Sequence, residues 1–375
     1  MNSSTQKEYG LRGRWIAARN RVLASPSFQR FAVRFPLMRP VARGRANALF
    51  DLVAGFTYSQ VLAACVETGL LEMLAEGPLD AATIAARMDL PPAGTLTLLR
   101  AAAALELTEP LGDHWVLGVG GAALRGNRGI AEMVAHHRLL YADLADPVGL
   151  LRRGGGGGAL SGLWHYAEAA GTGDAAAVGA YSALMAASQP MVAAQAIDAY
   201  AFHRHRRLLD VGGGEGAFAA AVGARVPRIA LGVFDLPPVA ERARVRLESA
   251  GLGGRSTTFG GDFLTDPLPS GHDIITLIRV LHDHDDAPAM TLLRNIHAAL
   301  PAGGTIFIAE PMAQTRGAEA MGDAYFGLYL LAMGSGRPRS RGEIAGMLRQ
   351  AGFARPRHLK TGMPLTASAI VATKL

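Results

Sequence analysis

Cysteine is almost missing from this chain, since Cys65 is the one thiol among 375 residues. A single cysteine cannot form an internal disulfide, so the disulfide-stapled class of secreted domain is excluded and a reducing, cytoplasmic setting is expected. We expect no secretory leader, because arginines alternate with the first apolar residues. Cys65 lies in the apolar run YSQVLAACVETGLLEML, which favours a packed core thiol over a reactive nucleophile.

Acidic residues are scarce at the start of the chain. Residues 1–46 hold one glutamate against nine arginines and one lysine, a net charge of +9, whereas the whole chain carries +6. The high isoelectric point therefore comes from this basic arm and does not indicate nucleic-acid binding by the body of the protein. Phe28, Phe31 and Phe35 recur at helical spacing within the arm. Such a stripe fits an anionic membrane surface, and it fits equally a terminal helix packed on a partner subunit.

Aromatic residues make up 6% of the chain, but half of its residues are apolar, which is enough for two domains with filled cores. The apolar spacing predicts one long helix over residues 50–77. DAATIAARM, AGTLTLLRAAAAL and LTEPLGDHWVLG follow in the order of a winged helix-turn-helix. The second of these helices offers Arg100 as its one cation, so DNA reading is not expected. We predict three parts, which are residues 1–46, 47–173 and 174–375.

Residues 121–173 contain few clear signals. The run RRGGGGGAL cannot hold a regular helix, so a flexible surface loop is predicted, and no strand leads into it as a phosphate-binding loop requires. His136 and His137 are adjacent on a predicted helix and point in different directions, with no acid or cysteine to complete a metal site. Two ordinary helix histidines are expected there.

The stretch LLDVGGGEG, residues 208–216, is an apolar strand that passes Asp210 and runs into four glycines. Glycine lacks Cβ and tolerates positive φ, so Gly212 and Gly214 leave a bare backbone shelf for a bulky polar ligand. The same kind of turn also opens dinucleotide-binding folds and plain strand-to-helix connections. By itself it predicts a nucleotide-like ligand no better than the simpler connection.

Further chemistry-bearing residues follow later predicted strands. ALGVFD ends in Asp235, at the distance where an acid meets a ribose diol, and DIITLIRVLHD runs into Arg279 and His282. Asp262 and Phe263 lie between these two segments. Because ligands of open α/β sheets collect beyond the carboxyl ends of the strands, we expect one crevice at this edge.

The motifs LLDVGGGEG, VFDLPPV, GGDF, IRVLHD and IFIAEP, in this order, resemble the class I S-adenosylmethionine-dependent O-methyltransferases, in particular the group with plant caffeate-type and animal acetylserotonin enzymes. The specific motifs cover about residues 175–375, and the N-terminal half matches more loosely. The resemblance implies an α/β fold with a Rossmann-like cofactor-binding domain preceded by a mostly helical winged-helix dimerisation domain. It also implies S-adenosylmethionine as the cofactor, a homodimer, and no metal.

The resemblance further implies roles for individual residues. His282 would be the base, Glu310 would orient its other ring nitrogen, and Asp283 would add negative charge. The implied cofactor contacts are Asp210, Gly212, Gly214, Asp235, Leu236, Asp262, Phe263, Arg279 and Gln189. The implied acceptor-pocket residues are Tyr181, Met185, Phe326, Tyr329, Leu330 and Met333. Each of these could instead be a cap or a core residue.

Two departures from the plant enzymes stand out. Pro338 falls at about the position of their second glutamate beside the base, and Ser188 replaces a pocket histidine. His282 would then have one carboxylate orienter. The phenol chemistry of the plant enzymes therefore does not transfer unaltered.

The segments ASPSFQRFAVRFPLMRP, FDLVAGFTYSQVLAACVETGLL and DAYFGLYLLAMGSGRPRS resemble the bacterial carotenoid 1-hydroxyl methyltransferases, which act on hydroxyneurosporene or demethylspheroidene. We therefore expect an apolar hydroxylated acceptor and a cytoplasmic enzyme that touches the inner or photosynthetic membrane through its basic arm. An aromatic polyketide, phenol or porphyrin-like acceptor is the alternative. A nicotinamide enzyme would leave GGDF and IRVLHD unexplained, and a non-catalytic regulator would not need His282 and Glu310.

Overall fold

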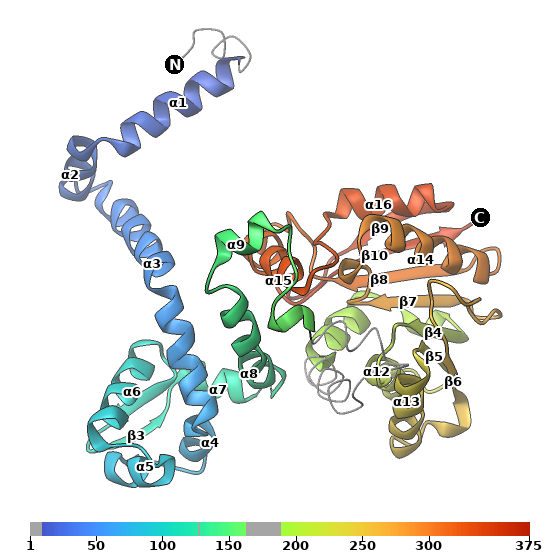
Figure 1. Cartoon of the computed structure of the whole chain (residues 1–375), viewed down its shortest axis with the longest axis horizontal. Helices are drawn as coiled ribbons and strands as arrows, with labels where there is room; N and C mark the ends of the chain where they lie inside the picture. Colours follow the sequence, from blue (N-terminus) through green and yellow to red (C-terminus); the bar gives the residue numbers. More distant parts are fainter. Residues whose placement is uncertain (1–9, 127, 163–188) are drawn as a thin grey trace. The chain divides into compact units, whose positions relative to one another are not determined.

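The computed structural model of the chain describes residues 10–126, 128–162 and 189–375, and it divides into two compact units, Met1–Gly120 and Gly121–Leu375 (Figure 1). The division at residue 120 does not test whether 46 and 173 bound independently folding parts. Those two boundaries stay predictions.

The first unit begins with three helices, α1 (Gly10–Ala24), α2 (Pro26–Arg34) and α3 (Arg39–Glu67). The Ser25 side chain caps α2 by accepting the N–H of Phe28, and a proline occupies its first turn. Residue 46 lies inside α3, so the basic arm and the following domain share one helix.

The single helix predicted over residues 50–77 is wrong in its length. Gly69 takes φ 67°, a left-handed conformation that ends α3 and starts α4 (Leu70–Ala75) in a new direction. Cys65 is fully buried at the end of α3, and burial raises its thiol pKa to about 11. The predicted core thiol is therefore confirmed.

The winged helix is confirmed. It consists of α5 (Ala81–Met88), α6 (Pro92–Ala104) and three short strands, β1 (Leu79–Asp80), β2 (Thr108–Leu111) and β3 (His114–Leu117), paired antiparallel in the order β1-β3-β2. The Asp80 carboxylate accepts the N–H groups of Ala82 and Thr83, each at 2.9 Å, and so fixes the start of α5.

The second unit is built on a seven-stranded sheet in the order β6-β5-β4-β7-β8-β10-β9. The first five strands are parallel, and β10 pairs antiparallel with both of its neighbours. The expected Rossmann-like domain is confirmed. The strands are β4 (Arg207–Val211), β5 (Ala230–Asp235), β6 (Ser256–Gly260), β7 (Ile274–Ile278), β8 (Thr305–Glu310), β9 (Phe353–Leu359) and β10 (Ser368–Lys374).

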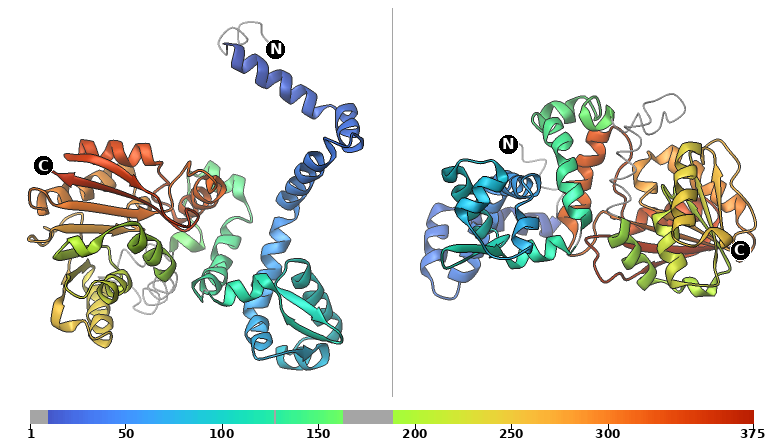
Figure 2. Two further views of the ribbon diagram at one scale, coloured as in Figure 1. Left: turned by 180° about the vertical axis from the view of Figure 1, so that it is seen from behind. Right: turned by 90° about the horizontal axis from the view of Figure 1, so that it is seen from below.

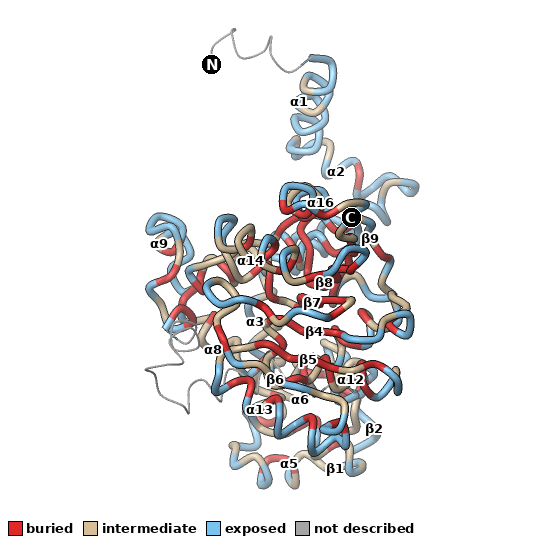
Figure 3. The backbone as a smooth tube through the Cα atoms, turned by 90° about the vertical axis from the view of Figure 1, so that its right-hand side faces the viewer, coloured by how far each residue is buried: buried red, intermediate tan, exposed pale blue. Residues whose placement is uncertain are grey.

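Side chains alternate across this sheet and form two cores. Leu208 and the helices α12 (Ala217–Arg225) and α13 (Pro237–Ser249) contribute to one core, together with helical residues 189–199. Leu209, α14 (Asp286–Ala299) and α16 (Arg341–Gln350) contribute to the other. Figures 2 and 3 show these helices around the sheet and the buried strands between them. The sheet is therefore covered on both faces, as parallel strands require.

The remaining described elements of this unit come from two parts of the sequence. The first group is α7 (Val119–Arg125), α8 (Arg128–Asp143) and α9 (Pro147–Arg152). The second is a π-helix, η4 (Ala320–Tyr325), which continues as α15 (Phe326–Met333). Three short 3-10 turns complete the unit, η1 (Phe202–Arg204), η2 (Gly253–Arg255) and η3 (Leu281–Asp283).

The glycine run after α9 lies outside regular secondary structure, as predicted, and it forms a turn held by hydrogen bonds. Glycines 154–157 all take positive φ, and the N–H of Gly156 donates to the Leu331 carbonyl at 2.8 Å. The buried Asp143 carboxylate accepts the N–H groups of Ala159 and Leu160, at 2.7 and 2.9 Å. Four successive left-handed residues are feasible only for glycine, so the composition reflects backbone conformation.

Candidate functional site

The glycine turn after β4 forms the bare shelf that its sequence predicts. Gly212, Gly214 and Gly216 take φ 65°, 56° and 76°. A Cβ on Gly212 would lie 2.8 Å from Val280, whereas one on Gly214 would meet nothing within 4 Å. The backbone is thus packed from below at Gly212 and open at Gly214, as close approach of a ligand requires.

Asp235, at the end of β5, ties the glycine turn to the next loop. Its carboxylate accepts the N–H of Gly214 at 2.7 Å and that of Leu236 at 2.8 Å. Burial raises the pKa of Asp235 to about 6, while the two N–H donors and the charge of Arg242 oppose that rise. Each carboxylate oxygen has a further lone pair, so the group can still accept from a ligand hydroxyl.

Asp210 lies fully buried beneath the shelf. One of its oxygens accepts the Thr276 hydroxyl at 2.6 Å, and the other, Oδ2, has no hydrogen-bond partner within the described part of the chain. Burial raises the pKa of this carboxyl to about 7. The Gln189 Oε1 atom is likewise buried without a partner among the described residues. Buried oxygens of this kind can accept hydrogen bonds from a polar ligand.

Asp262 and Phe263 follow β6 in a short turn. The Asp262 carboxylate accepts the N–H of Leu264 at 2.8 Å, and the Asn295 side chain donates to the Phe263 carbonyl at 3.0 Å. The Phe263 ring meets His284 edge-on, with ring centroids 5.3 Å apart. The turn is therefore fixed on both sides by contacts within the second unit.

Arg279 follows β7 with φ 59°, a strained value for a residue that is not glycine. Its N–H donates to the Ala309 carbonyl at 2.9 Å, which keeps the strained residue in the sheet. The cation also opposes protonation of His282. This position, at the carboxyl edge, is the one expected from the motif IRVLHD.

His282 lies on η3, directly after β7, and is 3% exposed. Its Nε2 lies 3.0 Å from the Asp283 carboxylate, and its Nδ1 has no hydrogen-bond partner among the residues that the structure describes. A carboxylate accepts a proton from its partner, so Asp283 fixes the neutral ring with hydrogen on Nε2 and the lone pair on Nδ1. The ring therefore offers one buried basic nitrogen.

Glu310, at the end of β8, does not make the predicted contact with the ring. Its Oε2 accepts the main-chain N–H of His282 at 3.1 Å, and its Oε1 has no partner in the described ranges. The carboxylate that contacts the ring in this structure is that of Asp283, at Nε2, and the orienting role of Glu310 stays a prediction. Burial raises the pKa of Glu310. Burial lowers the pKa of His282, but the charges of Asp283 and Glu310 outweigh it, so the net shift is upward.

The residues expected to line the acceptor pocket differ in how far they are buried. Phe326 packs on the His282 ring, with centroids 5.5 Å apart, and stays half-buried, as does Tyr329. Leu330 and Met333 are 1% exposed and belong to a buried core, and their role in the acceptor pocket stays a prediction. That core comprises Leu140, Leu150, Leu160, Leu330, Ala332 and Met333. Tyr181 and Met185 lie outside the described residues.

The adjacent histidines of α8 are paired with tyrosines. His136 Nε2 lies 2.9 Å from the Tyr329 hydroxyl, and His137 Nε2 lies 2.7 Å from the Tyr325 hydroxyl. Burial lowers the pKa of His136 to about 4 and raises that of Tyr325 to about 12, so both stay neutral. Sequence spacing could not find these pairs, because the partners are 193 and 188 residues apart.

A second group missed from the sequence is Arg339. Its guanidinium is fully buried and donates to the carbonyl oxygens of Leu281 and His284, each at 2.8 Å. The run GRPRS gives no periodic signal, although the residue is next to Pro338, where a departure from the plant pattern was noted.

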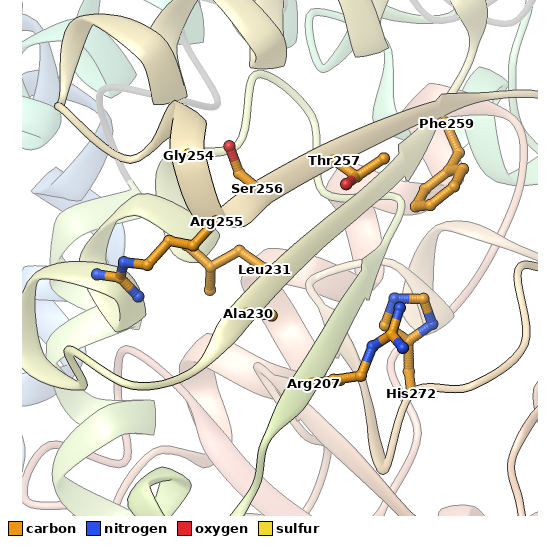
Figure 4. Close-up of a pocket in the computed structure, with 9 residues that line it drawn as sticks. All are labelled: Arg207, Ala230, Leu231, Gly254, Arg255, Ser256, Thr257, Phe259 and His272. Atoms are coloured by element: carbon orange, nitrogen blue, oxygen red, sulfur yellow. The ribbon is translucent and has the colours of Figure 1, made fainter.

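A hollow of about 190 Å³ lies at the opposite, amino-terminal ends of β4, β5 and β6 (Figure 4). Arg207 and His272 line it, and so does Arg255, whose guanidinium is held by the carbonyls of Val226 and Ile229. No residue predicted for the site belongs to it. Within the described ranges, no group of three or more His, Cys, Asp or Glu side chains is arranged to hold a metal.

Helix α3 has the length and apolar composition of a membrane span, with a mean hydropathy of 1.5 over its best window, of which 6% is buried. It is the one such helix among the described residues. Its first turns carry several cations, and the family match described below places its second half in a dimerisation domain. Length and composition alone therefore do not assign it to a membrane.

Comparison with known proteins identifies relatives of this chain. The O-methyltransferase domain family matches residues 141–354, and the O-methyltransferase dimerisation domain family matches residues 50–112. The chain is 44% identical to the demethylspheroidene O-methyltransferase of Cereibacter sphaeroides over 94% of each chain. It is 31% identical to the 3-hydroxy-5-methyl-1-naphthoate 3-O-methyltransferase of Streptomyces sahachiroi over 86% of this chain and 94% of that protein.

Among solved structures, human N-acetylserotonin methyltransferase in complex with S-adenosylmethionine is similar, with a TM-score of 0.73 and 26% identity over 88% of this chain and 97% of that one. The bare shelf at Gly214 and the orphaned acceptors of Asp210 and Gln189 fit that cofactor. The chain belongs to the S-adenosylmethionine-dependent O-methyltransferases, with a dimerisation domain ahead of its Rossmann-like domain.

Proposed function

We propose that this enzyme methylates the tertiary 1-hydroxyl of an acyclic carotenoid such as demethylspheroidene. The observation that carries the proposal is the 44% identity, over 94% of both chains, to an enzyme named for that acceptor. Phe326, packed beside the His282 ring, supports it because an apolar side chain borders the base. The proposed acceptor is thus a long apolar molecule with one hydroxyl at its reacting end.

The carboxyl edge of the sheet would hold the cofactor. In this proposal Asp235 accepts the ribose hydroxyls, Asp262 faces the adenine amino group, and Gln189 lies by the methionine end. Asp210, Leu236, Phe263 and Arg279 complete the set around the shelf of Gly212 and Gly214. Their positions at successive strand ends support these roles.

The bound cofactor supplies a methyl group already activated by a positively charged sulfur. The chain must therefore place the acceptor oxygen behind that carbon and take up the hydroxyl proton. His282 accepts the proton at Nδ1, and the Asp283 carboxylate stabilises the imidazolium that results through Nε2. Glu310 holds the main chain of the same residue. A tertiary alcohol is a weak acid, so this proton transfer accompanies attack and does not precede it.

The first unit would bring the enzyme to its substrate. Trp15, Phe31, Phe35 and Leu37 are exposed on α1, α2 and the turn that follows, among the arginines of the basic arm. Exposed apolar side chains among cations fit peripheral contact with an anionic inner or photosynthetic membrane. Flotation with anionic vesicles tests this contact, with a chain that starts at residue 39 as the comparison. Equal flotation of both chains would contradict it.

The decisive experiment is incubation with labelled S-adenosylmethionine and a panel of demethylspheroidene, hydroxyneurosporene and simple phenols. The expected result is label on the carotenoids, at the 1-hydroxyl oxygen.

An aromatic acceptor is the second candidate, favoured by the ring cluster of Phe326, Tyr325 and Tyr329, which would suit a flat ring. Label on the phenols alone would support that candidate and reject the carotenoid.

A further inference from the structure

The turn that carries His282 is held from outside by one short segment, residues 335–339, called here the clamp segment. All four successive carbonyl oxygens of residues 281–284 accept hydrogen bonds from it. The donors are the Arg339 guanidinium to Leu281 and His284, each at 2.8 Å, the Arg337 main-chain N–H to His282 at 2.9 Å, and the Ser335 hydroxyl to Asp283 at 2.8 Å.

Arg339 is the centre of the clamp segment. Its guanidinium is 0% exposed, and besides the two carbonyls it binds one oxygen of Asp286 at 2.7 and 3.0 Å. A buried guanidinium is costly unless its donors are satisfied, and here the planar fork spans three acceptors that a lysine could not reach together. Its own carbonyl accepts the N–H of Ala313, in the chain just after β8 and Glu310.

Gly336 brings the clamp segment into direct contact with the turn. It takes φ 78°, and a Cβ there would collide with the carbonyl oxygen of His282. Its N–H donates to the Asp285 carboxylate at 3.0 Å. The two backbones are therefore in van der Waals contact, and the carbonyl of His282 cannot move toward the clamp segment.

We propose that the clamp segment, through Arg339, is a positioning device that sets the orientation of the His282 imidazole. It does so by fixing the main chain on both sides of that residue. This inference rests on the proposed role of His282 as the base. It explains how one carboxylate on the ring, that of Asp283, is sufficient where Pro338 occupies the place of a second acid.

The orientation of the His282 ring should strongly affect the rate of methyl transfer. η3 is a single three-residue turn whose backbone carries the ring through two side-chain torsions. A misplacement of about 1 Å at a reacting group can cost roughly a hundredfold in rate. Loss of Arg339 would release two carbonyls of the turn and loosen the contact between His282 and Asp283 that keeps the imidazole pKa high.

The test compares Arg339→Met with Arg341→Met. Arg341 is an exposed arginine two residues further on, whose side chain contacts His358 and not the turn. For Arg339→Met we expect kcat with demethylspheroidene to fall roughly tenfold to a hundredfold. The KM for S-adenosylmethionine should stay within about twofold, and the acidic limb of the pH profile of kcat should move to lower pH. Arg339→Lys should recover part of kcat, and Arg341→Met should match the wild type.

Two results would overturn the inference. One is an unchanged kcat in a folded Arg339→Met protein, and the other is a fall in kcat with no movement of the acidic limb, which a purely structural role would give. If that variant does not fold, Ser335→Ala removes only the bond to the Asp283 carbonyl and must shift the same limb. His282→Ala, assayed alongside, separates the two proposals, because retained turnover in it would reject the base itself.

Discussion

The two units of this enzyme each have a buried core, but they differ in how much apolar surface one helix leaves exposed. In the second unit, the inward residues of the sheet and its helices, such as Ile275 and Leu293, are 0% exposed. In the first unit, α3 leaves a row of apolar side chains in the open. They are Leu49, Phe50, Leu52, Val53 and Phe56, from 62% to 82% exposed.

This difference concerns how much apolar surface each unit buries with its own residues. Burial of apolar surface stabilises a chain by about 25 cal/mol per Å², so the second unit obtains this term from its own residues. An exposed apolar row of this extent on one helix is typical of a contact surface. The matched dimerisation domain begins at residue 50 and takes in four of the five residues. Chemistry and assembly are thus assigned to different parts of the chain.

The largest expected effect lies in the second unit. His282→Ala should reduce turnover about 10²- to 10⁴-fold, because it removes the proton acceptor. Binding of S-adenosylmethionine, measured by calorimetry, should stay nearly unchanged, since the shelf and Asp235 are intact. His203→Ala, at an exposed histidine of the same unit, is the matched control. Unaltered turnover in the first variant would place the base elsewhere.

The next effect belongs to the first unit. Leu52→Asp combined with Phe56→Asp puts two charges on the exposed face of α3, and each apolar anchor of an interface contributes about 2 kcal/mol or more. We expect sedimentation to show monomers at concentrations where the wild type is dimeric, with cofactor binding by the second unit retained. A double variant that stays dimeric would contradict the assignment of the dimer contact to the exposed face of α3.

Local pattern predicted much of the fold and most positions of the site. Asp210, Asp235 and His282 each end or follow an apolar strand run, and parallel strands bring such ends to one edge whatever the packing between them. The contacts made there were less predictable. Glu310 binds main chain where a ring contact was expected, because a side chain's partner depends on the turn geometry and not on its place in a motif.

Long-range partners and backbone conformation account for the other errors. The pairing of His136 with Tyr329 and the clamp by Arg339 join residues that no periodicity connects. Gly69 breaks a helix that its apolar spacing would continue, and residues 154–157 use their glycines for fixed left-handed turns. Composition reports that glycine is permissive, but only the structure shows which conformation it adopts.

A matched pair of alanine substitutions compares the stability contribution of a buried leucine in the second unit with that of an exposed leucine in the first. Leu293→Ala opens a cavity in the sealed core of α14 and should lower the free energy of unfolding by about 2–5 kcal/mol. Leu52→Ala, on a side chain that is 82% exposed, should change the stability of the monomer by no more than about 0.5 kcal/mol. Denaturant unfolding at protein concentrations below dimer formation gives both values. Similar losses in the two variants would mean that Leu52 is already packed within its own chain.

The last prediction concerns the buried carboxyl of Asp210 in the sheet, whose effect appears only as a dependence of stability on pH. Burial raises the pKa of Asp210 from its ordinary value of 3.8 to about 7. The folded state therefore holds this proton more tightly than the unfolded state, and that contribution to stability is complete below pH 3.8 and is lost as pH rises through about 7. Without cofactor, this carboxyl should thus contribute a fall in melting temperature between pH 4 and pH 8, while His136, whose pKa is lowered to about 4, contributes in the opposite direction.

Asp210→Asn should remove the fall that this carboxyl contributes, because an amide does not titrate, and the difference in melting temperature between variant and wild type should therefore change with pH. Asp235, whose pKa is raised to about 6, has the same sign and remains in the variant, so the slope should shrink and not vanish. Asp198→Asn, at an exposed carboxylate paired with Arg225, should leave the slope unchanged. If Asp210→Asn melts with the wild-type pH dependence, the pKa of Asp210 is not raised by burial beneath the glycine shelf. The Oδ2 atom of Asp210 would then not support the proposed position of the cofactor.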